Sequence, residues 1–277
     1  MGLRINTNIS SLMAQRTLGG TKQELEKHLQ RLSTGSRINT AGDDAAGLAI
    51  SENLRAQVRG LKQAKRNAQD GVSLVQVSEG GLNEVTNILI RLRELAIQSA
   101  SDTVGDKERS FTDREFQALK SEMDRIAAST QFNGNPLLNG RGGVFEIQVG
   151  TGNNPLTDRI VYDAQNADVT LEALRLAGES CATKQGSQLA LAVIDDAIGQ
   201  VSKVRSDLGA MQNRLQSTIN NLGVNEENMT AANSRVRDAD LAEEVSEMTK
   251  NNILMQAGIS VLGQANASSQ AVLKLLS

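Results

Sequence analysis

Residues 54–96, LRAQVRGLKQAKRNAQDGVSLVQVSEGGLNEVTNILIRLRELA, decide the fold of this chain. Their apolar side chains recur at gaps of three, four or seven residues, the spacing that packs one helix against another along a seam. Proline disrupts a helix interior, and both prolines of the chain, Pro136 and Pro155, lie near its middle. The pattern predicts a long helix over about 44–100, with a second helical arm after the prolines.

Both ends of the chain also carry apolar residues at helical spacing. They are Leu18, Leu25, Leu29 and Leu32 near the start, and Leu241, Val245, Met248, Met255, Ile259, Leu262, Leu273 and Leu276 near the end. A lone pair of such helices is marginally stable in water. We therefore expect copies of the chain to pack against these ends, and head-to-tail contacts that do not close produce a filament.

Shorter signals divide the arms. Gly35 is placed to end a first helix, and Asp43 and Asp44 are acidic residues that favour a helix start. Gly80-Gly81 marks a point where the long helix could bend. The polar stretch 101–110 is typical of a turn, and a further helix of about 18 residues should follow it.

The middle of the chain contains the β signal. Phe145, Ile147 and Val149 alternate with polar residues, which predicts a strand. Residues 159–162 could return from the turn-rich 150–155, so we expect a hairpin near 144–163. Segment 164–186 gives only a weak amphipathic signal. The predicted fold class is mainly α: a long antiparallel helical coiled-coil rod with a small β-hairpin at its tip and with the N- and C-terminal helices paired.

Composition argues against several functions. Aromatic residues make up 2% of the chain, fewer than an enzyme pocket normally uses. The formal net charge of −3 does not favour nucleic-acid binding, and no apolar run is long enough to span a membrane. The single histidine, His28, and the single cysteine, Cys181, have no metal-binding or catalytic partners in the sequence. We expect no catalytic residue, metal or cofactor.

Several motifs resemble bacterial flagellin. The segment RINTAGDDAAG, residues 37–47, carries the strongest likeness, and QAKRNAQDG at 63–71 and TQFNG at 130–134 support it. In the last third, LGAMQNRL at 208–215 and QAG at 256–258 fit the C-terminal pattern of that family. The likeness covers roughly 3–140 and 190–277, so the chain is similar to a minimal flagellin without large outer domains.

The resemblance implies a domain plan and a route of assembly. Residues 1–43 plus 234–277 would form the inner-tube coiled coil, and 44–233 the rod-like wall. The chain would be an extracellular subunit, exported unfolded by the flagellar type III system, that polymerises into the filament used for swimming. Its partners would be other copies, with flagellar cap, junction and export-chaperone proteins.

The resemblance also implies one specific surface. In this family Toll-like receptor 5 recognises a face of the long helix, and the matching positions are Arg91, Leu95 and Glu115. We expect contacts between subunits to be their main role. Two alternatives stay open at this point: the flagellin-related hook–filament junction protein, and a cell-surface enzyme displayed on a helical stalk.

Overall fold

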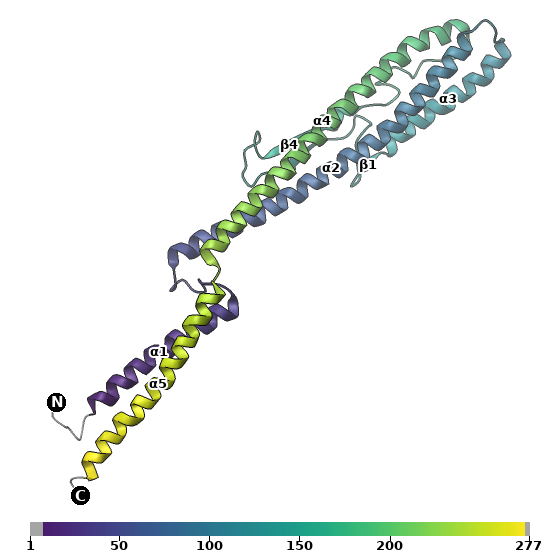
Figure 1. Cartoon of the computed structure of the whole chain (residues 1–277). Helices are drawn as coiled ribbons and strands as arrows, with labels where there is room; N and C mark the ends of the chain where they lie inside the picture. Colours follow the sequence, from purple (N-terminus) through teal and green to yellow (C-terminus); the bar gives the residue numbers. More distant parts are fainter. Residues whose placement is uncertain (1–7, 275–277) are drawn as a thin grey trace. The chain divides into compact units, whose positions relative to one another are not determined.

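The computed structural model describes residues 8–274, with side chains described as far as Ser268. Five α-helices account for most of this part of the chain: α1 (Ile9–Thr34), α2 (Ala45–Ala100), α3 (Asp106–Ser129), α4 (Lys184–Arg237) and α5 (Leu241–Lys274). The strands are few and short (Figure 1). The expected fold class, mainly α with a small β-hairpin, is confirmed.

Contacts along the chain define two compact units. The terminal unit comprises 1–56 and 228–277, and the central unit comprises 57–227. Helices α2 and α4 contribute residues to both units. We describe each unit by itself.

In the central unit, α2 lies antiparallel to both α3 and α4. Arg91 pairs with Glu115 of α3, and Arg93 pairs with Asp195 of α4. Nearer the start of α2, Lys65 lies 3.8 Å from Glu226, close to the end of α4 in this unit. From Lys65 to Arg93 of α2, the partner residue on α4 changes from Glu226 to Asp195. From Arg91 to Ser99, the partner residue on α3 changes from Glu115 to Arg109. Both helices therefore run antiparallel to α2.

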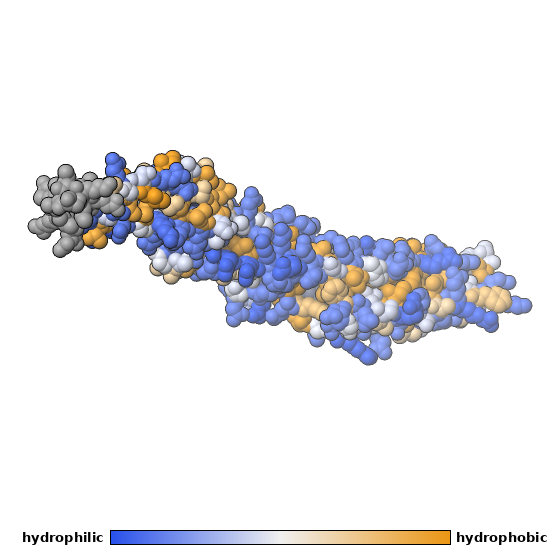
Figure 2. Space-filling model, turned by 90° about the horizontal axis from the view of Figure 1, so that it is seen from below, coloured by the Kyte–Doolittle hydropathy of each residue, from blue (hydrophilic) through white to orange (hydrophobic). Residues whose placement is uncertain are grey.

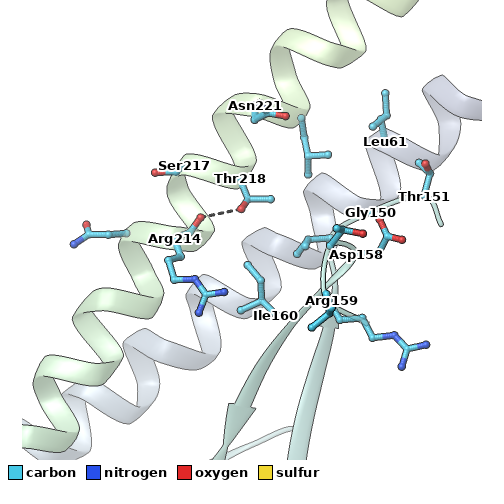
Figure 3. A pocket seen from close by; sticks show the side chains of 15 residues that line it. Leu61, Gly150, Thr151, Asp158, Arg159, Ile160, Arg214, Ser217, Thr218 and Asn221 are labelled. Atoms are coloured by element: carbon cyan, nitrogen blue, oxygen red, sulfur yellow. Dashed lines mark hydrogen bonds between the residues drawn. The ribbon is translucent and has the colours of Figure 1, made fainter. Parts of the chain in front are cut away.

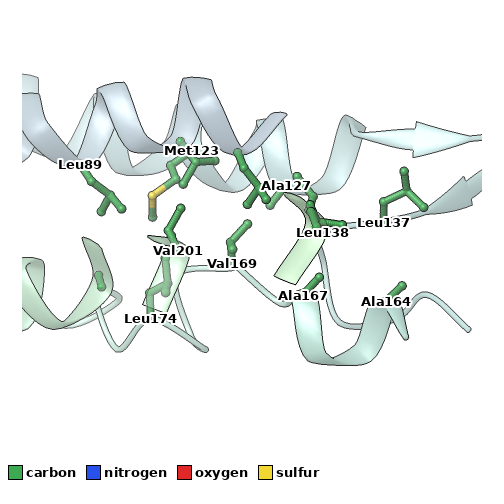
Figure 4. Packing of buried hydrophobic residues seen from close by; sticks show 14 of the residues in the cluster. Leu89, Met123, Ala127, Leu137, Leu138, Ala164, Ala167, Val169, Leu174 and Val201 are labelled. Atoms are coloured by element: carbon green, nitrogen blue, oxygen red, sulfur yellow. The ribbon is translucent and has the colours of Figure 1, made fainter. Parts of the chain in front are cut away.

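The core of the central unit is aliphatic. Of the heptad positions predicted on α2, Leu82, Val85, Leu89 and Leu92 are fully buried, whereas Val58, Leu61 and Val72, nearer the start of the helix, are half-buried. Small residues such as Ala127 and Ala167 let the neighbouring elements approach (Figure 4). Phe116 is the one completely buried aromatic ring among the described residues. A thin core between helices therefore needs few rings.

Loop segments after α3 complete this core. Leu137, Leu138 and Leu176 are fully buried, and Leu174 is almost so. Lys120 of α3 donates to the carbonyls of Ala177 and Glu179, at 3.0 and 2.8 Å, and so holds the loop on the helix. Segment 164–186, which the sequence left undecided, forms a 3₁₀ turn at Ala164–Ala167 followed by further turns.

Two hairpins lie in this region. Strands β1 (Gln131–Phe132) and β2 (Asn135–Pro136) flank a tight turn in which Asn133 and Gly134 have φ of 50° and 80°. The expected hairpin is formed by β3 (Val144–Gln148) and β4 (Arg159–Asp163). It does not lie at the tip of the helices, as predicted, but packs along α2, where Asn67 donates to the carbonyl of Gln148 at 3.0 Å. Its register places Phe145 opposite Tyr162 and Ile147 opposite Ile160, which puts the apolar face of both strands on the helices.

The boundaries differ from the expectation at one turn. Residues 101–110 are not all turn, because α3 already begins at Asp106. Asp106 and Glu108 lie in its first turn, where the helix dipole favours acidic side chains. Arg109 donates to the carbonyls of Ser99 and Ser101, both at 2.9 Å, and satisfies the end of α2. Residues 106–110, which were predicted to lie in a turn, therefore form the start of α3.

The Gly80-Gly81 pair does not interrupt α2, which is helical through both positions. A methyl group on Gly81 would lie 2.7 Å from Thr130 Oγ1 and 2.8 Å from Leu138 Cδ1, whereas Gly80 has no atom within 4 Å of that position. Gly81 therefore lets the segment after α3 approach the helix closely.

This difference predicts opposite effects for two adjacent substitutions. Gly80→Ala should raise the free energy of unfolding by about 1 kcal/mol, because alanine is the better helix former. Gly81→Ala should lower it by about 1 kcal/mol, since an overpacking cost of about 1–3 kcal/mol exceeds that gain. Urea unfolding of the full-length monomer, followed by circular dichroism, measures both. Equal effects would show that the close approach at Gly81 is unimportant.

Candidate assembly surfaces

Helices α1 and α5 form the body of the terminal unit and run antiparallel. Asn8 donates its side-chain amide to the carbonyl of Ala265 at 3.0 Å. Near the other end of α1, His28 Nδ1 lies 2.5 Å from Glu244 Oε2. These two pairs fix one alignment along the seam between the helices.

The residues predicted to pack at the ends are only partly covered by this pairing. Leu25 is buried, with 9% of its surface exposed. Leu18, Leu32, Met248, Met255 and Leu262 are half-buried. Four others are exposed: Leu29, Leu241, Val245 and Ile259. Leu276 and the side chain of Leu273 lie outside the described residues.

Further apolar side chains on the same two helices are exposed. They are Ile9, Leu12 and Met13 on α1 and Ile253, Leu254 and Val261 on α5, each with about half or more of its surface in water. Figure 2 shows such hydrophobic side chains gathered in the part of the chain that leads to the uncertain ends. Sequence reasoning followed a single stripe and missed them. The signal that could have found them is that apolar residues occur all around α5.

The connectors between the helices are hydrogen-bonded to each other. The backbone N–H of Arg37 donates to the carbonyl of Arg237 at 2.7 Å, and the N–H of Ala239 donates to the carbonyl of Gly35 at 3.0 Å. Gly35 ends α1 with φ of 67°, as expected for a glycine cap. Ile38 is 1% exposed and anchors the first connector. Helix ends that are far apart in sequence are thus tied together.

The two acidic residues of this connector accept backbone hydrogen bonds, Asp44 at the start of α2 and Asp43 within the connector itself. Asp44 accepts a hydrogen bond from the N–H of Gly47 at 2.8 Å, which is the N-cap contact. Asp43 accepts from the N–H groups of Asn39 and Thr40, at 3.1 and 2.9 Å. These backbone hydrogen bonds lower the pKa of the Asp43 carboxyl group, and the bond from Thr40 has the largest effect. Both carboxylates therefore have a structural role.

The surface predicted around Arg91 is assembled only in part. Arg91 donates to Glu115 of α3 at 2.9 Å and to Glu94 at 2.9 Å, and all three side chains are about half exposed. Hydrogen bonds to Glu94 and Glu115 raise the pKa of the Arg91 guanidinium group. Leu95 differs from the prediction, because it is 2% exposed and lies in the core of its own unit. The exposed face consists of Arg91, Glu94 and Glu115 without Leu95.

A groove of about 720 Å³ lies in the central unit (Figure 3). Apolar side chains of Leu61, Ile160 and Leu222 line it, together with polar residues of the β3–β4 loop and of α4. Thr218 in this wall donates to the carbonyl of Arg214 at 2.9 Å, within its own helix. The titratable groups that line the groove do not converge as a catalytic set would.

Residues 8–274 also contain neither a metal site nor a helix that could span a membrane. No group of three or more His, Cys, Asp or Glu residues in this part could hold a metal ion. None of the helices described combines the length and the apolar character needed to cross a bilayer. What the described surface does offer is exposed apolar helix faces, concentrated on α1 and α5.

Comparison with known proteins places the chain in a family. Residues 5–142 match the model of the bacterial flagellin N-terminal helical region, and 191–276 match the C-terminal helical region. A flagellin of Halalkalibacterium halodurans is 47% identical, and the match covers 98% of this chain and 99% of the relative. A flagellin of Bacillus subtilis is 42% identical, over 99% of this chain and 100% of the relative.

Solved structures agree with the fold. The crystal structure of Bacillus cereus flagellin matches with 31% identity and a TM-score of 0.51, covering 61% of this chain and 94% of that one. A flagellar hook-associated protein of Vibrio parahaemolyticus matches at 15% identity and a TM-score of 0.57, over 71% of this chain and all of that one. The second match concerns the fold alone.

A mainly α subunit whose terminal helices leave apolar faces exposed is typical of proteins that assemble with copies of themselves. The chain belongs to the bacterial flagellin family, and it is a structural subunit of the flagellar filament rather than an enzyme.

Cys181 is fully buried in the central unit, near Asp113, Lys120 and Ser187. Burial disfavours the thiolate and raises the pKa of the thiol to about 11.

The thiol should therefore be unreactive in the native protein. At pH 8 a group with this pKa is a thiolate about one part in 1000 of the time, and the thiolate is the nucleophile. We expect labelling by a disulfide reagent to proceed at least 100-fold faster in 8 M urea than in buffer at the same pH. Comparable rates in the two solutions would show that the thiol is accessible in the native chain.

Proposed function

We propose that the terminal unit supplies the inner contacts between copies in the filament, and that the central unit forms the surrounding wall. The predicted division was 1–43 plus 234–277 against 44–233. The compact units divide after residue 56 and before residue 228, so the terminal unit includes more of α2 and α4 than the prediction gave it. The observation that supports this role is the exposure of apolar side chains on α1 and α5 in the single chain.

The physical argument concerns the cost of that exposure. Fully covering a leucine, isoleucine or valine side chain stabilises an assembly by about 1.5–3 kcal/mol. The exposed residues lie on more than one face of α5, so one partner helix cannot cover them all. Neighbouring copies on several sides can, and the same contact repeated head to tail builds an open helical polymer.

Other partners follow from the family rather than from a particular contact. We propose that export occurs through the flagellar type III system, that an export chaperone, the cap and the junction proteins handle the chain, and that the filament is extracellular. The exposed Arg91 and Glu115 would serve contacts between subunits, and in the monomer they would be open to Toll-like receptor 5. No observation favours the hook–filament junction alternative.

Removal of α5 tests the proposal directly. A chain that ends at residue 240 should fail to polymerise, because most of the exposed apolar surface of the terminal unit is lost. A finer test is Ile253→Lys, which adds a charge at a side chain that is 61% exposed in the single chain. It should leave the melting temperature of the monomer nearly unchanged and abolish sedimentable filaments.

The matched control is Gln188→Lys, which adds the same charge at an exposed position of the central unit. We expect this variant to polymerise within about twofold of the parent chain. Normal filaments from Ile253→Lys, seen by electron microscopy, would contradict the assigned role of α5.

Polymerisation should also increase helix content. The α1–α5 pair buries few of its own side chains, so we expect it to fray in the isolated chain and to become ordered when neighbours cover it. Circular dichroism of matched monomer and filament samples measures the change. Equal helicity in both states would show that the pair is already complete in the single chain.

A further inference from the structure

The seam between α1 and α5 buries polar side chains more completely than apolar ones. Of the side chains described on these two helices, Ser11, Leu25, Glu244 and Asn251 are buried, and only one of the four is apolar. Met248, Met255 and Leu262 lie at the same seam but stay partly in water. Hydrophobic packing therefore contributes little to the choice of which residues of α1 face which residues of α5.

Apolar contacts alone would leave the alignment of the two helices weakly defined. The apolar residues of α5 are spread around the helix, as the exposed Ile253, Leu254 and Val261 show. If α1 moved along α5 by one turn, its leucines would meet other apolar residues of similar size. Hydrophobic burial is non-directional, so the shifted pairing would cost little.

One polar cluster cannot tolerate such a shift. His28 Nδ1 lies 2.5 Å from Glu244 Oε2, and Arg31 Nη1 donates to Glu244 Oε1 at 3.2 Å. The side chains of His28 and Glu244 are only 13% and 9% exposed, and that of Arg31 is 28% exposed. His28 and Arg31 are separated by about one turn of α1, so both reach the same carboxylate. A one-turn displacement would leave a buried carboxylate without these partners, which is costly.

We propose that His28, Arg31 and Glu244 set the register of α1 against α5, and that this register gives every subunit the same assembly surface. The three residues act by positioning the helices and need not contact a neighbouring copy. A single buried polar residue fixes the register of coiled coils in the same way. The inference deepens the proposed role of the terminal unit in the filament and rests on it.

Two other contacts report the same alignment and supply a way to measure it. Asn8 bonds to Ala265, and Leu18 lies against Gly258, where an added Cβ would be 2.9 Å from Leu18 Cδ1. Cysteines at 18 and 258 should therefore cross-link when the helices are in register. Cysteine at 254 or 262, one turn away on α5, should pair with cysteine at 18 only when they are shifted.

The experiment compares the yields of these cross-links in filaments of the full-length chain, in a Cys181→Ala background. The apolar variant His28→Leu, Arg31→Met, Glu244→Leu removes the cluster and leaves no buried charge unpaired. We expect it to form filaments, while the in-register cross-link falls at least threefold and the shifted cross-links appear. Glu243→Leu, at the exposed neighbouring position in the first turn of α5, is the matched control and should keep the parent pattern.

A swapped variant, His28→Glu with Glu244→His, keeps the pairing groups in the same gap and should restore the in-register yield. The parent cross-link pattern in the apolar variant would overturn the proposal. If the apolar variant forms no filaments, failure of the swapped variant to restore both filaments and in-register cross-linking would overturn it as well.

Sedimentation separates this result from a failure of the proposed function. If Ile253→Lys polymerises normally, the role of α5 in assembly is wrong, whatever the cross-links show.

Filaments mixed from chains that carry a single cysteine, at 18 or at 258, reveal cross-links between subunits. A yield in the mixed filaments equal to that of the double-cysteine chain would assign the contact to neighbouring copies and overturn the register role within one chain.

Discussion

Helices α1 and α5 keep large apolar side chains such as Leu12, Ile253 and Val261 in water, and this exposure distinguishes the terminal unit from the central one. In the central unit, α2, α3 and α4 bury many apolar side chains completely, and loop residues such as Leu138 are buried with them. In the terminal unit, Leu25 is the one buried apolar residue described on α1 and α5. We therefore expect the central unit to be folded in the single chain, and the terminal unit to gain free energy when neighbouring copies cover its apolar side chains.

In the terminal unit, hydrogen bonds of polar groups hold the segments in place, whereas in the central unit apolar packing does so. The connectors around Arg37 and Ala239 are tied by backbone hydrogen bonds. Asp43 accepts from the N–H of Thr40 inside the first connector, and Asp44 accepts from the N–H of Gly47 at the start of α2. Hydrogen bonds are directional, so they define geometry where hydrophobic area is scarce. The motif that resembles flagellin most strongly, residues 37–47, coincides with this connector. Its residues serve the geometry of the helix junction and not a chemical reaction.

For the function of this chain, similarity of fold is weaker evidence than similarity of sequence. The hook-associated structure shares the helical arrangement at 15% identity, so the arrangement by itself does not distinguish a filament subunit from its relatives. Sequence matches to flagellins over nearly the whole chain make that distinction. The side chains on the surfaces of the helices, and not the helices themselves, carry the specific function.

The spacing of apolar residues, the Gly35 and Asp44 caps and the alternation around Ile147 are local signals, so the long helices and the β3–β4 hairpin could be predicted from the sequence. The start of α3 at Asp106, the burial of Leu95 and Cys181, the contact of Gly81 with Leu138 and the pairing of His28 with Glu244 could not. All but the first of these depend on which segments come together from distant parts of the chain. A local pattern says which residues share a helix face, whereas the partner of that face is fixed only when the whole chain packs.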